Sequence, residues 1–214
     1  MLLNTYIDHT LLKADATVDD IKKLCTEAKE HDFYAVCVNG YYVALADSEL
    51  MHTDIKVAAV VGFPLGAMLA RAKVFEAQQC IDQGADEIDM VINIGLLKSG
   101  YYKIVEDEIR ALKKAIGDNV LKVIFENCYL TDEEKRIACT LSLNAGADFI
   151  KTSTGFGTGG ATLEDVKLMK NEVKDHVKIK ASGGIRDVET AKQYINLGVS
   201  RIGTSSGIPI VTSY

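Results

Sequence analysis

Two lysines each end an apolar segment and precede a run of small and hydroxyl residues. Lys151 follows GADFI and precedes TSTGF, and Lys180 precedes ASGG. Small residues let a ligand approach the backbone closely, and free backbone N–H groups there can hold an anion. A single lysine of this kind is usually just solvated at a strand end. Two lysines in the same arrangement indicate a shared chemical function.

The chemistry that such a pair favours is the capture of a carbonyl group. An amine attacks a carbonyl only when it is unprotonated, and a free lysine has a pKa of about 10.4. A second ammonium at ~6 Å, with an effective dielectric constant of ~20, disfavours the charged form by roughly 3 kcal/mol, or about two pKa units. Either Lys151 or Lys180 could then form a Schiff base.

Asp89 lies in a segment, 87–91, where acidic and apolar residues alternate. In a strand, Asp89 would point away from the face that carries Ile88 and Met90. A carboxylate beside the lysines can move protons through a water or a substrate hydroxyl. A plain ion pair with one lysine explains the spacing equally well, so both interpretations stay open.

Short apolar segments alternate with amphipathic ones along the chain, which predicts strands separated by helices. The predicted strands cover 7–12, 33–38, 55–61, 87–91, 121–126, a short segment ending at 151, 177–182 and 200–203. The predicted helices cover 18–31, 41–51, 69–83, 101–116, 131–144, 162–173 and 188–197. The remaining segment, 208–214, is a C-terminal tail without an assigned element.

This alternation implies parallel βαβ units and an α/β fold. A helix–turn–strand unit recurs at 84–89, 146–151 and 198–203, and no Pro- or Ser-rich linker divides the chain. We therefore predict one (β/α)8 TIM barrel domain over residues 1–214. A doubly wound open sheet is the alternative, but no Gly-x-Gly-x-x-Gly motif follows the first strand.

In a barrel the outward strand face packs on helices, and the C-terminal strand ends carry the active site. The positions that fit the outward face are apolar: Ile88, Met90, Ile150, Ile179 and Ile202. The alternate positions, Asp89, Lys151 and Lys180, then point inward near the ends of their strands. Cys37 and Glu126 point inward by the same rule. Ionisable groups that converge at one mouth are costly to desolvate unless they have a function.

Composition excludes several other classes of protein. A net charge of −6 argues against a nucleic-acid surface, and the five scattered cysteines suit reduced thiols better than a disulfide framework. The N-terminus lacks the basic and apolar regions of a signal peptide, and no uncharged apolar stretch approaches membrane-spanning length. We expect a cytoplasmic protein without nucleic-acid or membrane partners.

Four segments closely resemble the deoxyribose-phosphate aldolases, a family of class I, Schiff-base-forming aldolases: KTSTGF at 151–156, KASGGIR at 180–186, EIDMV at 87–91 and IDHTLL at 7–12. The resemblance runs from about Ile7 to Ser206. It implies a metal-independent lyase of deoxyribose phosphate catabolism that needs no cofactor. The implied reaction is the reversible cleavage of 2-deoxy-D-ribose 5-phosphate to D-glyceraldehyde 3-phosphate and acetaldehyde.

The resemblance also implies roles for single residues. Lys151 would form the Schiff base, Lys180 would lower its pKa and handle protons, and Asp89 would relay protons. The family places Asp8 and Cys37 close to the site. The phosphate-binding residues of the family correspond to Thr154, Gly155, Gly183, Gly184, Ser205 and Ser206. These residues lie in loops rich in glycine and hydroxyl residues, and without the resemblance such loops would be interpreted as plain turns. Some members carry a lysine in place of Phe156, so phosphate binding here would depend more on backbone dipoles.

The tail raises one further hypothesis. The last strand of a barrel delivers the chain to the rim, so a short tail could bring the Tyr214 phenol over the site to exchange a proton with an enamine carbon. A frayed terminus without a role is equally compatible with this sequence. Homodimer formation also stays open.

Three other functions explain fewer of these residues. A metal-dependent aldolase needs clustered ligands, and His9, His31, His52 and His176 show no ligand spacing. A pyridoxal-phosphate barrel would use one strand-end lysine but not the pair. A phosphate-binding barrel without catalytic activity would explain the glycine loops and leave Lys151, Lys180 and Asp89 without a function.

Overall fold

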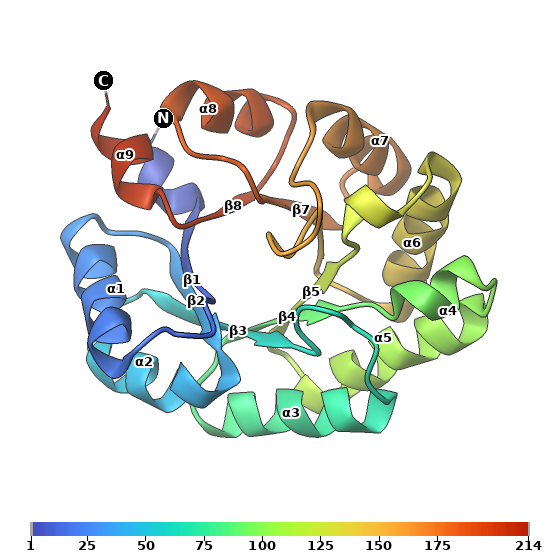
Figure 1. Ribbon diagram of the computed structural model, residues 1–214, viewed down its shortest axis with the longest axis horizontal. Helices are drawn as coiled ribbons and strands as arrows, with labels where there is room; N and C mark the ends of the chain where they lie inside the picture. The colour runs from blue at the N-terminus through green and yellow to red at the C-terminus, as the bar shows by residue number, and fades with distance from the viewer. Residues whose placement is uncertain (1, 214) are drawn as a thin grey trace.

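Eight parallel strands close into one barrel in the computed structural model, which describes residues 2–213 (Figure 1). Each strand pairs with the next in chain order, and β8 pairs with β1. The strands are β1 (Ile7–Leu11), β2 (Ala35–Asn39), β3 (Lys56–Val61), β4 (Glu87–Val91), β5 (Val120–Ile124), β6 (Phe149–Lys151), β7 (Lys178–Ser182) and β8 (Arg201–Thr204). The predicted (β/α)8 barrel is confirmed.

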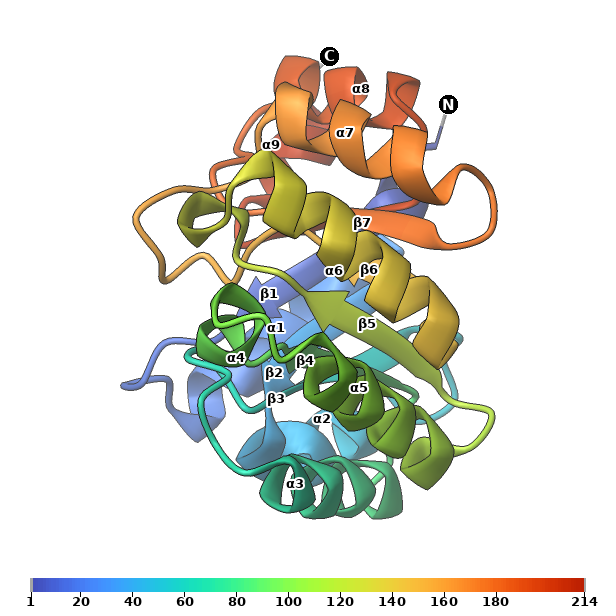
Figure 2. The same cartoon turned by 90° about the vertical axis from the view of Figure 1, so that its right-hand side faces the viewer.

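Helices surround the barrel on its outside, as two perpendicular views show (Figures 1 and 2). They are α1 (Val18–Glu30), α2 (Val43–Glu49), α3 (Ala70–Asp82), α4 (Ile94–Lys98), α5 (Tyr102–Ile116), α6 (Asp132–Ala145), α7 (Leu163–Val173), α8 (Val188–Asn196) and α9 (Gly207–Thr212). Capping boxes begin two of them: Thr17 caps α1 together with Asp20, and Thr131 caps α6 together with Glu134.

The main hydrophobic core lies between the strands and the ring of helices. The apolar positions predicted to face outward, including Ile88, Ile150 and Ile202, belong to this core and have no solvent exposure. A smaller apolar cluster of Leu12, Cys37, Ala58 and Val60 is separate from it. The strand alternation read from the sequence therefore assigns the outward face of these strands correctly.

Two short helices and one strand end differ from the predictions. Helix α4 was not predicted, and α9 lies in the segment left unassigned as a tail. They are five and six residues long, too short to show a helical period. Strand β5 ends at Ile124, so the inward position expected for Glu126 by alternation does not apply. Glu126 adopts a left-handed conformation with φ of 56° instead.

None of the helices within residues 2–213 combines the length and the apolar character needed to cross a membrane.

Candidate active site

Seven charged side chains, almost completely buried, fill the inside of the barrel. They are Asp8, Glu87, Asp89, Lys122, Lys151, Lys180 and Arg201, and none is more than 4% exposed. We call this set the charged cluster. Its members come from β1, β4, β5, β6, β7 and β8. The sequence predicted three of them to converge, and the structure brings these three together with four more.

Strand register places the cluster at neighbouring levels of the barrel. Lys151 pairs in register with Lys180, and Lys180 pairs in register with Arg201, the first residue of β8. Gly203 lies beside them on β8, where a Cβ atom would come within 3.0 Å of Lys180 Cε. Because Gly203 has no side chain, there is space for the side chain of Lys180 beside it.

Asp89 is the centre of the charged cluster. Its Oδ2 accepts hydrogen bonds from Lys151 Nζ and Lys180 Nζ, both at 2.8 Å, and its Oδ1 accepts one from Lys122 Nζ at 2.7 Å. Because the first two nitrogens share one oxygen, they are at most twice 2.8 Å, or 5.6 Å, apart. Asp89 is therefore paired with three lysines, whereas the sequence suggested at most one ion pair.

Asp8 adds a second carboxylate on the far side of Lys180. Its Oδ2 is in ion-pair contact with Lys180 Nζ but accepts no hydrogen bond of good geometry, and its Oδ1 accepts one from Arg201 Nη1 at 2.6 Å. Lys180 consequently lies between two carboxylates, while Lys151 contacts only Asp89. Asp8, which the resemblance associates with the site, thus lies against Lys180.

Because of this difference in carboxylate contacts, the pKa values of Lys151 and Lys180 shift in opposite directions. Burial lowers the pKa of Lys151; Asp89 opposes this effect, and the Lys180 ammonium adds to it. Burial also acts to lower the pKa of Lys180, but Asp8 and Asp89 outweigh it and raise that pKa. The sequence argument attributed the lowered pKa to the neighbouring ammonium alone, and the structure adds burial as the larger cause.

The carboxylates are held in their ionised form. Burial acts to raise the pKa of Asp89, but Lys122, Lys151 and Lys180 outweigh it and hold the pKa well below the usual value. In the same way, Lys180 and Arg201 overcome burial and lower the pKa of Asp8 to about 2. Asp89 is therefore ionised in the resting site, and a proton that it accepts would be held only briefly.

A cavity of about 240 Å³ opens above Lys151 at the C-terminal ends of the strands. Its wall includes five of the six predicted phosphate-binding residues: Thr154, Gly155, Gly183, Gly184 and Ser205. Ser206 does not line it; the Ser206 N–H donates to Thr204 Oγ1 at 2.9 Å. Two cationic side chains that the sequence analysis did not single out, Lys13 and Arg186, also line the cavity and are exposed.

The loop after β6 forms one side of the cavity. The Glu126 carboxylate accepts hydrogen bonds from the N–H and the hydroxyl of Thr154, which fixes the start of this loop. Farther along, Phe156 packs edge-on against Phe63, with ring centroids 5.2 Å apart. Phe156 is thus an aromatic part of the cavity wall.

Cys37 lies inside the barrel next to the charged cluster, as predicted. It is completely buried, and burial raises the pKa of its thiol. The thiol is therefore protonated at neutral pH and adds no charge to the site.

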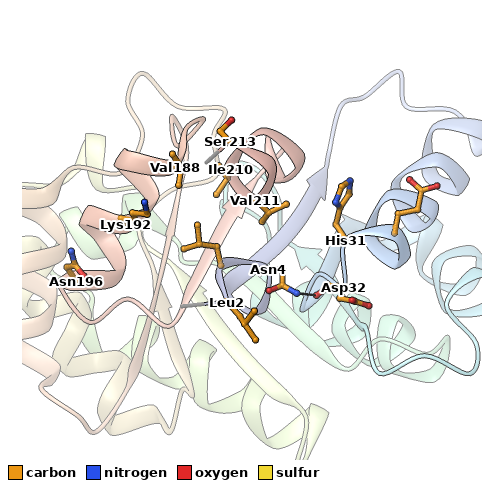
Figure 3. A pocket seen from close by; sticks show the side chains of 12 residues that line it. Leu2, Asn4, His31, Asp32, Val188, Lys192, Asn196, Ile210, Val211 and Ser213 are labelled. Atoms are coloured by element: carbon orange, nitrogen blue, oxygen red, sulfur yellow. Dashed lines mark hydrogen bonds between the residues drawn. The ribbon is translucent and has the colours of Figure 1, made fainter.

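Tyr214 lies outside the described residues. Ser213, the residue before it, lines a different cavity, of about 630 Å³, whose wall includes Leu2, His31 and Lys192 (Figure 3). This outer cavity is formed by the N-terminal segment together with the end of α1, α8 and α9. None of its lining residues belongs to the charged cluster.

Lys122, Glu87 and Arg201 are the residues of the cluster that the sequence analysis missed. Lys122 Nζ contacts Glu87 Oε2 at 2.5 Å, and Arg201 Nη2 contacts Glu87 Oε1 at 2.6 Å. Alternation from Asp89 would have placed Glu87 inward as well, and that signal was present in the sequence. Within residues 2–213, no group of three or more His, Cys, Asp or Glu side chains is arranged to hold a metal ion.

The chain is similar to known proteins over nearly its whole length. The family model described as "DeoC/LacD family aldolase" matches residues 2–210. A deoxyribose-phosphate aldolase of Brevibacillus brevis is 57% identical over 212 residues, which are 99% of this chain and 96% of the relative. One of Finegoldia magna is 59% identical over 211 residues, 99% of each chain. The solved structure of a tetrameric deoxyribose phosphate aldolase from Aeropyrum pernix has a TM-score of 0.89 at 32% identity, covering 99% of this chain and 90% of that one.

Proposed function

This chain belongs to the DeoC/LacD family of aldolases, and we propose that it reversibly cleaves 2-deoxy-D-ribose 5-phosphate to D-glyceraldehyde 3-phosphate and acetaldehyde through a Schiff base on Lys151. The chain is an aldolase, a carbon–carbon lyase. Relatives that are more than half identical over nearly their whole length carry the name of this reaction. The Schiff base and the residues that form it are inferred from the site.

The observation that carries the proposal is the position of Lys151. Of the three lysines in the charged cluster, it alone lines the cavity at the mouth. It also has the lowered pKa, whereas the pKa of Lys122 and that of Lys180 are raised by their carboxylate partners against the effect of burial. A neutral amine that faces a substrate cavity is what attack on an aldehyde requires.

The reaction would begin when Lys151 Nζ attacks C1 of the open-chain sugar. Loss of water gives an iminium ion, which takes up the electron pair of the breaking C2–C3 bond to become an enamine. The C3 hydroxyl loses its proton, and C3 leaves as the aldehyde carbon of D-glyceraldehyde 3-phosphate. Protonation of the enamine carbon and hydrolysis then release acetaldehyde and regenerate the amine of Lys151.

Protons would move through Asp89 and Lys180. Asp89 Oδ2 accepts hydrogen bonds from both lysine nitrogens, so it can take up a proton released at Lys151 and pass it on, and Lys180 stabilises the carboxylate once that proton has left. Because Lys180 retains its own proton, it also keeps a positive charge beside the amine. A water or the C3 hydroxyl would connect this pair to the reacting carbons.

A direct assay tests the proposed reaction. The purified protein, treated with a chelator, is incubated with 2-deoxy-D-ribose 5-phosphate, and both aldehydes are measured after derivatisation with a hydrazine reagent. We expect equal amounts of D-glyceraldehyde 3-phosphate and acetaldehyde, and the same rate with and without the chelator. If no acetaldehyde forms, or if the chelator abolishes turnover, the proposal is wrong.

The phosphate group of the substrate would bind between the loops after β6, β7 and β8. Gly183 and Gly184 have φ values of 86° and 84°, a backbone conformation in which a glycine exposes its N–H groups without steric cost. Ser205 adds a hydroxyl from the last loop. Backbone dipoles of this kind bind anions without a dedicated lysine.

Ser205→Asp is expected to raise KM for 2-deoxy-D-ribose 5-phosphate by about tenfold or more, because a carboxylate would face the substrate phosphate. Cleavage of unphosphorylated 2-deoxyribose should change much less. Steady-state kinetics on both sugars measure the difference, and Ser48→Asp, an exposed change on α2, is the matched control. Equal losses on both sugars would place the phosphate elsewhere.

A further inference from the structure

Arg201 has no place in the mechanism proposed above, although it is almost fully buried at the start of β8. Its guanidinium donates to Asp8 Oδ1 and Glu87 Oε1, both at 2.6 Å, and lies 3.2 Å from the ring centroid of Tyr34. Only 4% of the residue is exposed to solvent. A guanidinium is charged at every pH at which the protein is folded. Arg201 is therefore a fixed positive charge inside the barrel.

The charges of the cluster do not balance when every group is ionised. Three carboxylates, of Asp8, Glu87 and Asp89, face four basic groups, of Lys122, Lys151, Lys180 and Arg201. The remaining strands add no further buried charge: β2 contributes the protonated thiol of Cys37, and β3 contributes Ala58 and Val60. Lys56 and Lys178, the first residues of β3 and β7, reach solvent. The buried carboxylate of Glu126 lies beyond the end of β5, where it binds Thr154 and no member of the cluster. One surplus positive charge remains. An uncompensated charge in a buried site is costly, so the loss of one proton is favoured.

Ion-pair contacts decide which lysine loses that proton. Lys180 contacts Asp8 and Asp89, and Lys122 contacts Glu87 at 2.5 Å, Asp89 at 2.7 Å and Asp8 at 4.0 Å. Lys151 contacts Asp89 alone. Deprotonation of Lys151 therefore weakens the fewest ion pairs, and it leaves the cluster electrically neutral.

We propose that Arg201 is a positioning residue that acts from the bottom of the charged cluster, supplying the fixed positive charge that allows Lys151 to exist as a free amine. Without Arg201, three carboxylates would face three lysines, and neutrality would require Lys151 to keep its proton. This inference rests on the proposed function only in taking Lys151 as the nucleophile. It assigns a catalytic effect to a residue that touches neither the cavity nor the reacting atoms.

The test measures the titration of Lys151 itself, independently of turnover. Brief labelling with acetic anhydride at a series of pH values, followed by mass spectrometry of the peptide that carries Lys151, gives the pH at which this amine is half protonated. Arg201→Met should move this midpoint to higher pH by about one unit, the size expected for loss of one charge at ~9 Å with an effective dielectric constant of ~20. At neutral pH, the rate of Schiff-base formation should fall about tenfold.

Removing a carboxylate should have the opposite effect. Glu87→Gln takes one negative charge from the cluster, so the midpoint of Lys151 should move to lower pH. The double variant Glu87→Gln/Arg201→Met restores the balance of charges and should return the midpoint close to that of the unaltered protein. Arg201→Lys keeps the charge and should also keep the midpoint. Tyr34→Leu removes the ring that packs on the guanidinium and is the control for packing without a change of charge.

The outcomes separate the inference from the proposed function. An unmoved midpoint in folded Arg201→Met, or an alkaline shift in Glu87→Gln, overturns the inference while the aldolase reaction stands. If Arg201→Met does not fold, Glu87→Gln and the double variant decide the question by the same criteria. If the unaltered protein forms no Schiff base at Lys151, the proposed function fails first.

Discussion

Lys151→Ala is expected to lower the turnover of 2-deoxy-D-ribose 5-phosphate by roughly 10⁴-fold or more, because removal of a covalent nucleophile leaves only binding and general electrostatic effects. Lys151 is the only lysine of the charged cluster that lines the cavity, and Lys180 contacts two carboxylates that hold its proton. Lys180 therefore cannot replace the missing amine. The measurement is the rate of acetaldehyde release by the purified variant.

Lys178→Ala is the matched control for Lys151→Ala. Lys178 begins β7 at the N-terminal end of the barrel, where it is exposed to solvent near the ring of Phe149. Removal of the Lys178 side chain should leave the turnover rate within about twofold of that of the unaltered protein, since surface substitutions of this kind have small effects. Residual activity in Lys151→Ala above about 1% of the original rate would mean that another group forms the covalent intermediate.

Lys180→Leu is expected to move the rising limb of the pH–rate profile to higher pH by about two units. Loss of this ammonium removes a positive charge within 5.6 Å of Lys151 Nζ, twice the 2.8 Å distance to the shared oxygen. The pKa of Lys151 then rises, and the fraction of free amine at neutral pH falls about a hundredfold. Part of the activity should return at alkaline pH, where Lys151 deprotonates again.

The shape of that profile distinguishes two roles for Lys180. A shifted profile with a nearly normal plateau means that its charge controls the state of Lys151. A profile that is lowered at every pH without a shift, in a variant that retains its circular dichroism spectrum, would mean that Lys180 acts mainly by transferring a proton. The second result would contradict the electrostatic account.

Much of the barrel could be predicted because it follows from local patterns. Ile88, Ile150 and Ile179 alternate with Asp89, Lys151 and Lys180, and a strand has only two faces. Once the apolar residues are assigned to the helices, the ionisable ones must point inward. The closed eightfold arrangement then follows from the repeated strand–helix unit.

Lys122 was missed because the repeat was misleading at this position. The sequence groups Lys56, Lys122 and Lys178 as lysines near the beginnings of alternate strands. Lys56 and Lys178 are the first residues of β3 and β7, but β5 begins at Val120, so Lys122 is its third residue. Two more residues of strand carry it from the rim into the barrel, where Asp89 and Glu87 bind it.

Arg201 was missed for a different reason. It begins β8, a position at which a basic side chain usually reaches solvent, and nothing close to it in the sequence is acidic. Its partners, Asp8 and Glu87, lie 193 and 114 residues away along the chain. Only closure of the barrel brings them together. The number of charges in the cluster is thus a property of the tertiary structure.

Reductive trapping tests the central claim most directly. The protein is incubated with acetaldehyde and borohydride, digested, and the peptides are mapped by mass spectrometry. We predict one added ethyl group, on the peptide that contains Lys151 and not on the peptide that contains Lys180, with no label in Lys151→Ala. Label on Lys180 would reverse the roles of the two lysines, and the absence of label from both would contradict a Schiff-base mechanism.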